Sequence, residues 1–408
     1  MVSHTGSNTE SHGETKLHVG KFSASGLLQT VAWVGVLLGA IGFGMGYVKN
    51  PEAMWPAYLQ GFFFVSCLAL GGLFFTTINN IAKAGWSTSI RRISEGMTSF
   101  IPVIAVGGLV LAFLGLKTLY PWARPEEVLA EPVIAAKTAF LNKGFFIVRL
   151  VVFGLGMFLF AKATVGNSLQ QDQNGDEKFT HRNVAIGVAF LLFFALSYSL
   201  FSVDFLMSLM PSWYSTIFGI YCFSGLFQSS LAFLVLLLIY FKRKGFVQGY
   251  YSIEHIHDVA KFLKGFTVFW AYIAFSQFML IWYANIPEET EYYLMRAQNG
   301  WMLISMLLLI GKFIIPFLAL LPRWAKRTES HLILVAVWIL LMQYVDIFWM
   351  VGPNFHDNQM SLGFYDFSLL AGFLGIYFLL MIRFFSRHSL VALKDPRLSE
   401  ALTHHVSY

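Results

Sequence analysis

The sequence predicts an all-α membrane protein that crosses the bilayer about ten times. Hydrophobic residues make up 57% of its 408 residues and charged residues only 12%, whereas roughly a quarter of the residues in soluble domains are charged. Ten separate runs are apolar over about 20 residues, the length that a helix needs to cross a hydrocarbon core about 30 Å thick. Because backbone exposed to lipid has to satisfy its own hydrogen bonds, a bundle of helices is the expected assembly.

The ten runs lie near 26–48, 57–82, 97–119, 144–164, 184–207, 213–240, 263–285, 297–321, 331–351 and 366–385. They define one predicted transmembrane domain over 26–385, with polar cytoplasmic tails at 1–25 and 386–408. The first 25 residues lack the apolar stretch of a cleavable signal peptide, so the first run is expected to stay as a membrane helix.

Basic residues are divided unevenly between the two sides of this predicted bundle. Twenty lysines and arginines lie on the side of the termini and six on the other side. Positive residues are retained in the cytoplasm, so both termini are predicted to be cytoplasmic. The basic clusters are short and lie between apolar runs, which explains the net charge of +6 without nucleic-acid binding. Tryptophans at the outer ends of the runs are expected to form an interfacial belt with the lipid headgroups, namely Trp55, Trp122, Trp213, Trp282 and Trp349.

A short internal repeat indicates how the helices are grouped. Residues 89–95 read SIRRISE and residues 252–258 read SIEHIHD, and the two segments enter helices three and seven from the same side. Their separation by four helices predicts two four-helix bundles, helices 2–5 and helices 6–9, related by an axis along the membrane normal. Helices 1 and 10 would flank the two bundles.

Residues that hold redox cofactors are scarce inside the predicted helices. The two cysteines, Cys67 and Cys222, fall within apolar runs, and all eleven histidines fall in tails, loops or helix ends. A zinc site, an iron–sulfur cluster or a haem held by this chain is therefore not expected. If the protein takes part in redox chemistry, the electrons must pass to cofactors in partner subunits.

A few ionisable residues lie inside the apolar runs and are candidates for a proton path. Each costs about 2.5–3.5 kcal/mol at the centre of a helix on insertion scales, so its presence suggests a function. The candidates are Lys312, deep in helix eight, and Asp204, Asp346 and Asp366, towards the outer ends of helices five, nine and ten. One hypothesis is that the three carboxylates form an outer cluster that accepts protons from a quinol. The alternatives are that Lys312 reaches the cytoplasmic boundary or pairs with a neighbouring helix, and that Arg149 pairs with one aspartate and joins two helices.

A second set of candidates lies where helix seven begins, and consists of Glu254, His255, His257 and Asp258. These groups suggest a proton entrance, because histidine titrates near neutral pH. The alternative is an ordinary solvated helix end. The two histidines are separated by two positions, which does not place them on one helix face, so a metal site is not indicated.

Several segments resemble a known family. Residues 84–98, AGWSTSIRRISEGMT, resemble the cytoplasmic turn of NrfD-type proteins, the polysulfide reductase membrane subunits. Residues 211–219 (PSWYSTIFG), 255–258 (HIHD), 269–272 (FWAY), 275–279 (FSQFM) and 282–290 (WYANIPEET) resemble quinone-binding subunit 2 of alternative complex III, a bacterial quinol:cytochrome c oxidoreductase. The likeness covers most of helices two to nine.

This resemblance implies a multi-pass subunit of the bacterial inner membrane, surrounded by lipid and lying beside a paralogous ten-helix subunit. Extracytoplasmic iron–sulfur and c-type cytochrome subunits would carry the electrons away. The chain would contribute to quinol oxidation, to proton translocation or to both, and it is open whether it is itself catalytic. Quinone is implied as a ligand by the family name, but no quinone-binding residue is assigned, and the site is equally expected in the paralogue. Two other functions remain open: a secondary transporter, and a structural anchor for extracytoplasmic electron carriers.

Overall fold

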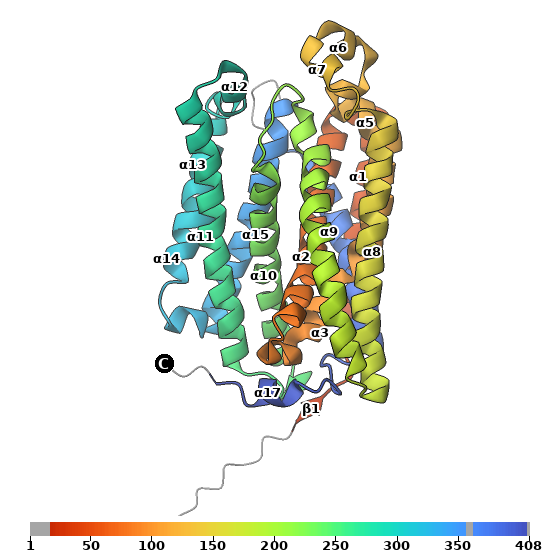
Figure 1. Cartoon of the computed structure of the whole chain (residues 1–408), viewed down its shortest axis with the longest axis vertical. Coiled ribbons are helices and arrows are strands. Elements are labelled where there is room, and N and C mark those ends of the chain that lie inside the picture. The colour runs from red at the N-terminus through yellow and green to blue at the C-terminus, as the bar shows by residue number, and fades with distance from the viewer. Residues whose placement is uncertain (1–16, 356–361, 406–408) are drawn as a thin grey trace, which may run out of the picture.

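The computed structural model describes residues 17–355 and 362–405, and it is a bundle of long helices (Figure 1). Ten helices in this part of the chain are long and apolar enough to cross a membrane. The predicted fold class, an all-α polytopic membrane protein, is therefore confirmed.

The spans match the ten predicted runs, and most continue further into polar sequence. Seven are single helices: α1 (Gly26–Lys49), α2 (Pro51–Ile81), α8 (Lys143–Asn174), α9 (Lys178–Phe205), α10 (Phe218–Arg243), α11 (Ile253–Ala284) and α16 (Phe364–Arg387). The ninth span is α15 (Glu329–Val351), followed by the 3-10 turn η8 (Gly352–Asn354). The third span, Gly85–Leu119, consists of η1 (Gly85–Ser87), α3 (Thr88–Met97), η2 (Thr98–Phe100), α4 (Ile101–Val110), the π-helical η3 (Leu111–Gly115) and α5 (Leu116–Leu119). The eighth span, Trp301–Ala319, consists of α13 (Trp301–Leu307), the π-helical η6 (Leu308–Ile314) and α14 (Ile315–Ala319).

Short elements cover the two ends of the bundle. One end, here called the terminal face, carries η7 (Trp324–Lys326), α17 (Leu398–Leu402) and an antiparallel pair of strands, β1 (His18–Val19) and β2 (Val247–Gln248). The other end, here called the opposite face, carries η4 (Pro121–Ala123), α6 (Pro125–Ala130), α7 (Pro132–Ala136), η5 (Met207–Leu209) and α12 (Pro287–Met295). Figure 1 shows β1 and α17 at the bottom and α6, α7 and α12 at the top.

The contacts between helices agree with the grouping that the repeat predicts. In the first bundle, α2 packs against α9 and the third span, and α8 packs against α9 and α4. In the second bundle, α10 packs against α11 and α15, and both α11 and α15 contact the eighth span. The flanking helices α1 and α16 pack on each other, and α16 also packs on α2.

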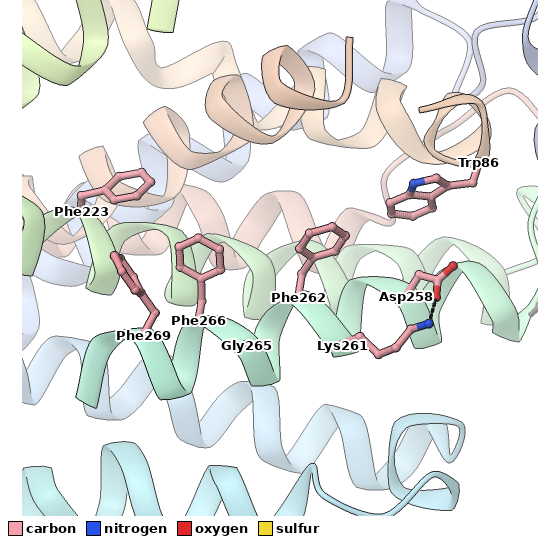
Figure 2. Close-up of a pocket in the computed structure, with 8 residues that line it drawn as sticks. All are labelled: Trp86, Phe223, Asp258, Lys261, Phe262, Gly265, Phe266 and Phe269. Carbon is pink, nitrogen blue, oxygen red and sulfur yellow. Dashed lines mark ion pairs between the residues drawn. The ribbon is translucent and has the colours of Figure 1, made fainter. Parts of the chain in front are cut away.

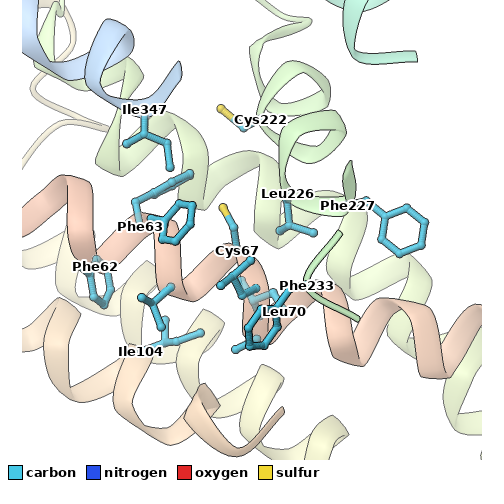
Figure 3. Packing of buried hydrophobic residues seen from close by; sticks show 14 of the residues in the cluster. Phe62, Phe63, Cys67, Leu70, Ile104, Cys222, Leu226, Phe227, Phe233 and Ile347 are labelled. Atoms are coloured by element: carbon cyan, nitrogen blue, oxygen red, sulfur yellow. The ribbon is translucent and has the colours of Figure 1, made fainter. Parts of the chain in front are cut away.

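The core lies along the seam where α2 meets α10. These two helices are apolar on all sides and are the most buried spans, as is expected for helices that are surrounded by protein. Figure 3 shows Phe63, Cys67 and Leu70 of α2 close to Cys222 and Leu226 of α10. Both cysteines are free thiols buried in this seam.

The predicted tryptophan belt is wrong for four of its five members. Trp55, Trp122, Trp213 and Trp349 are buried, and only Trp282 is exposed, at 68%. The buried indoles pack against other polar-aromatic groups instead of headgroups. The Trp213 ring stacks on Tyr292 at 3.9 Å between centroids, and the Trp349 indole donates a hydrogen bond of 2.9 Å to Ser305. These tryptophans close the protein interior at the opposite face.

The C-terminal segment after α16 packs on the terminal ends of both bundles. Asp395 lies 2.6 Å from the guanidinium of Arg91, which is buried in α3 of the first bundle. His404 lies 2.6 Å from Asp258 at the start of α11 in the second bundle. The segment predicted as a polar tail therefore links the two bundles through residues 388–405.

Candidate functional site

The strongest candidate site is a group of polar side chains buried inside the second bundle. The Lys312 ammonium lies 2.5 Å from the Asp346 carboxylate and 2.6 Å from the side-chain oxygen of Gln343. Tyr221 donates a hydrogen bond to the other oxygen of Asp346, and the Trp270 indole donates one of 3.2 Å to the oxygen that Lys312 contacts. All five side chains are buried. We call this group the core cluster.

The two charges of the core cluster balance each other, and both charged groups are hydrogen-bonded. The Asp346 carboxylate accepts from an ammonium, a hydroxyl and an indole, so its charge is balanced and hydrogen-bonded. The Lys312 ammonium also lies 4.6 Å from the centre of the Trp270 ring, which adds a cation–π attraction. Two structural alternatives were given for Lys312. Extension of its side chain to the cytoplasmic boundary is wrong, and pairing with a neighbouring helix is confirmed by its contact with Asp346 of α15.

A π-helical segment positions Lys312. It lies in η6, where the wider turn leaves backbone carbonyls without their usual α-helical partners. The Trp338 indole donates a hydrogen bond of 2.7 Å to the carbonyl of Gly311, and the Gln228 amide donates one of 3.4 Å to the carbonyl of Lys312. Side chains of α10 and α15 thus stabilise the π-helical turn that carries the lysine.

Substituting Trp338 with Phe is expected to destabilise the protein by about 1–3 kcal/mol. The ring is kept, but the Gly311 carbonyl loses its only side-chain donor among the described residues and stays desolvated. The free energy of unfolding in a denaturing-detergent titration measures the effect. Trp33→Phe is the matched control, because Trp33 is 61% exposed and the described chain gives its indole no hydrogen bond. Equal stabilities of the two variants would contradict this role of Trp338.

The depth of the core cluster follows from its place in the helices. Lys312 follows Trp301, the first residue of the eighth span, by eleven positions, which is about 16 Å at 1.5 Å per residue. That distance is about half of a hydrocarbon core about 30 Å thick. The cluster therefore lies near the middle of the span and far from water on both sides.

Asp204 is held by Arg149 in the first bundle. The guanidinium makes a two-pronged contact with the carboxylate at 2.7 and 2.8 Å, and it lies against the rings of Phe140 and Phe145 at 3.9 and 4.4 Å from their centres. The alternative in which Arg149 pairs with an aspartate is thus confirmed, and the pair joins α8 to α9. A guanidinium keeps its proton under physiological conditions. This geometry suits a structural clamp better than a proton relay.

Asp366 caps α16 and is not part of an outer carboxylate cluster. Its carboxylate accepts a hydrogen bond of 2.8 Å from the backbone N–H of Gly363. Asp204 is bound to Arg149, and Asp346 is bound to Lys312, on other helices. Within the described part of the chain, no contact joins the three aspartates. The predicted carboxylate cluster is therefore wrong, because each of the three carboxylates binds a different donor.

The four candidates at the start of α11 form a compact polar group at the terminal face. Glu254 forms an ion pair with Arg327, and Asp258 forms ion pairs with Lys261 at 2.7 Å and with His404 at 2.6 Å. The His255 ring completes a capping box with Ser252, accepting from its backbone N–H at 3.2 Å.

The histidines of this group are buried and not solvated. His255 is 2% exposed and His257 is 1% exposed, so the reading of an ordinary solvated helix end is wrong for both. In the described ranges, no three histidine, cysteine or acidic side chains come close enough to hold a metal ion. His18 lies in β1, within the predicted N-terminal tail, and the remaining described histidines lie in loops or near helix ends, as predicted. His4, His12 and His356 lie outside the described residues.

Several polar side chains, including the charged Arg296, lie between the core cluster and the opposite face. The Tyr221 hydroxyl is bound to Asp346, and the buried Tyr292 hydroxyl has no hydrogen-bond partner among the described residues. The Arg296 guanidinium stacks on Tyr292 at 3.5 Å and donates to the backbone carbonyls of Tyr292, Trp349 and Met350. Arg296 is one of the six basic residues that the sequence places on the side opposite the termini, and Tyr221 is not among the predicted site residues. The signal that was available was the pair of glutamines, Gln228 and Gln343, in otherwise apolar runs.

Polar contacts are interrupted towards the terminal face. The amide of Gln228 donates a hydrogen bond of 3.0 Å to Thr267, one turn of α11 closer to that face than Trp270. Between Thr267 and His257, the buried residues of α11 are Val259, Ala260 and Leu263, and Asp258 faces its ion-pair partners. Polar side chains thus lie on the opposite side of the core cluster, although no hydrogen bond among the described residues joins Tyr221 to them, and the buried residues of α11 on the terminal side are apolar as far as Asp258.

Comparison with known proteins assigns no family: no model of a protein family matches the chain, and no curated protein matches it.

Proposed function

We propose that this chain is a proton-transferring membrane subunit of a bacterial quinol:cytochrome c oxidoreductase of the alternative complex III class. The observation that carries the proposal is the buried pair of Lys312 and Asp346 in the middle of the second bundle. Ionisable groups at this depth are costly and are characteristic of proton and ion pathways. The sequence resemblance supplies the kind of complex, and the core cluster supplies the chemistry of this subunit.

The pair of opposite charges is suited to taking up one proton and releasing another. When a proton binds to Asp346, the Lys312 ammonium loses its counter-charge in a site of low dielectric constant. Loss of the lysine proton then restores a site without net charge, so uptake and release are coupled. Oxidation of a quinol yields a quinone, two electrons and two protons. In this proposal, partner subunits carry the electrons while the core cluster transfers protons.

The polar residues near the cluster suggest the direction of release. Tyr221 contacts Asp346 directly, and beyond it Gln277 donates a hydrogen bond of 3.2 Å to Tyr293 and accepts one of 3.3 Å from Ser215. These groups lie between the cluster and the opposite face, which the charge distribution predicts to be extracytoplasmic. Hydroxyl groups both donate and accept hydrogen bonds, so they can pass protons along such a series.

A structural anchor is the second candidate, and one observation favours it. Polar contacts are interrupted between Thr267 and His257, on the side from which protons would be taken up from the cytoplasm. If no proton crosses this section, the core cluster only joins the eighth span to α15.

The test begins with purification of the protein from its native membrane in mild detergent and identification of the chains that accompany it. We expect c-type cytochrome and iron–sulfur subunits, a second ten-helix subunit and quinol-dependent cytochrome reduction. Isolation of the chain alone and without haem absorbance would overturn the proposed complex and favour a transporter.

The role of the core cluster is then tested in liposomes that contain the assembled complex. The variant Lys312→Met with Asp346→Asn removes both charges and avoids an unpaired buried charge. We expect it to retain quinol-dependent cytochrome reduction and to lose the protons translocated beyond those released by quinol itself. An unchanged ratio of protons to electrons would exclude the core cluster from the path and support the anchor. Arg124→Ala, which alters a half-exposed ion pair at the opposite face, is the control.

A further inference from the structure

An aromatic groove lies on the outside of α11, close to the terminal face. Its volume is about 650 Å³, and it is lined by Trp86 of η1, Phe223 of α10 and Lys261, Phe262, Phe266 and Phe269 of α11. Figure 2 shows the phenylalanine rings in a row along α11, with the indole of Trp86 and the ion pair of Asp258 and Lys261 at one end. We call this feature the aromatic groove.

The groove is open along its length. A side-chain carbon added to Gly265, which lies between Lys261 and Phe269, would meet nothing within 4 Å. Phe262 is 46% exposed, although its ring stacks on Trp86 at 6.2 Å. The floor of the groove is built from both bundles, because the Phe227 ring of α10 packs on Phe266 at 4.5 Å and on Phe74 of α2 at 4.9 Å.

Two further lysines, Lys264 and Lys326, lie beside the ion pair at the polar end of the groove. The charge of Asp258 is matched by Lys261, and the His404 ring lies 2.6 Å from the same carboxylate. Lys264 does not line the groove but follows Lys261 by about one turn of α11. It makes no ion pair within the described ranges, and it lies near Lys326, whose ammonium donates to the carbonyls of Leu320, Leu321 and Pro322. Burial, followed by the nearby charges of Lys264 and Lys261, lowers the pKa of Lys326 below its usual value. A bound anion would relieve this repulsion.

The length of the groove matches one leaflet of a bilayer. From Lys261 to Phe269 the helix rises about 12 Å at 1.5 Å per residue, which compares with about 15 Å for half of the hydrocarbon core. Trp86 lies at the charged end, the position that tryptophan prefers in the headgroup region. The groove therefore presents cations at headgroup depth and aromatic rings at acyl-chain depth.

We propose that the aromatic groove is a binding site for one anionic phospholipid of the leaflet at the terminal face. The phosphate would lie against Lys261 and Lys264, and one acyl chain would lie along Phe262, Phe266 and Phe269. Basic pockets between membrane helices bind anionic headgroups in this way. A quinone is a poorer match, because its neutral ring gains nothing from these lysines. The bound lipid would pack against both bundles, and this role is independent of proton transfer.

Native mass spectrometry of the purified protein, with the subunits that accompany it, tests the proposal. After delipidation the protein is titrated with phosphatidylglycerol or with phosphatidylethanolamine. We expect one tightly held phosphatidylglycerol in the wild type. The variant Gly265→Leu, which fills the groove, should lose this lipid. The variant Gly166→Leu should retain it, because a side-chain carbon at Gly166 of α8 also meets nothing within 4 Å.

The charge requirement is tested by Lys264→Gln, which leaves the pair of Asp258 and Lys261 intact. We expect the preference for phosphatidylglycerol over phosphatidylethanolamine to fall about fivefold, the effect of one cation near an anionic lipid. Equal lipid retention by the wild type and Gly265→Leu would overturn the site. Equal affinity of the wild type for both lipids would overturn the preference of the site for an anionic lipid. Displacement of the lipid by added menaquinone or ubiquinone would overturn the choice of a phospholipid as the occupant.

Discussion

Asp346→Asn alone is expected to destabilise the protein by about 3–5 kcal/mol, whereas Asp346→Asn combined with Lys312→Met is expected to cost much less. The single variant leaves the ammonium of Lys312 buried without a counter-charge, at 0% exposure, and an uncompensated buried charge carries this penalty. The double variant removes both charges, and the asparagine still accepts a hydrogen bond from Tyr221. Free energies of unfolding from a denaturing-detergent titration, measured at one pH, give the four corners of the mutant cycle.

The expected result is a strong coupling between the two substitutions. A half-exposed pair, Arg124 and Glu127 at 3.0 Å, serves as the control, and its coupling is expected to stay below about 1 kcal/mol. If the effects of Lys312→Met and Asp346→Asn simply add, the pair is not the main interaction of either side chain, and the model of coupled proton uptake and release loses its basis.

Corresponding helices of the two bundles carry ion pairs of different chemistry. The third and fourth helices of the first bundle contribute Arg149 and Asp204, and those of the second bundle contribute Lys312 and Asp346. The repeat therefore places a cation and a carboxylate between corresponding helices twice. Arginine forms the two-pronged, permanently charged pair, whereas lysine can lose its proton. This difference is the physical reason to expect proton transfer in the second bundle and a clamp in the first.

The sequence predicted the membrane fold well because the cost of exposing polar backbone to lipid leaves few alternatives. It also identified Lys312 and Asp346 through the cost of charge in an apolar run. It did not predict that they form a pair, because η6 changes the direction of the lysine side chain by means of a π-helical turn that has no clear sequence signal. Tyr221 and Trp270 were missed for a related reason, since an aromatic residue with one polar atom does not stand out among 42 phenylalanines and many other aromatics.

Burial was the property that the sequence predicted least well. Lipid tails are as apolar as a protein core, so hydropathy does not separate a helix inside the bundle from a helix at its edge. Helices α1 and α2 have similar mean hydropathy, yet α2 is almost wholly buried and α1 is mostly exposed. The same limitation made Trp55 and Trp213 look like interfacial residues, and it hid the burial of His255 and His257.

Small residues, by contrast, indicate where membrane helices approach one another closely. One such position is the crossing of α1 and α16. A side-chain carbon added to Gly39 of α1 would lie 2.5 Å from the α-carbon of Gly372 in α16, and one added to Gly372 would lie 2.7 Å from the α-carbon of Gly39. Both clashes are with backbone, which no change of rotamer relieves. The packing of α1 on α16 thus depends on glycine at this crossing.

Gly39→Leu is therefore expected to separate α1 from α16 and to destabilise the protein by about 3 kcal/mol, the upper part of the usual range for overpacking. Gly44→Leu in the same helix is the matched control, because a side-chain carbon there meets nothing within 4 Å. Thermal unfolding in detergent, together with protease cleavage near Asn50 between α1 and α2, distinguishes the two variants. Since α16 also packs on α2, loss of the crossing should loosen α1 while the two bundles and the core cluster stay folded. Equal stability of the Gly39 and Gly44 variants would show that α1 is held by the surrounding lipid and not by this crossing.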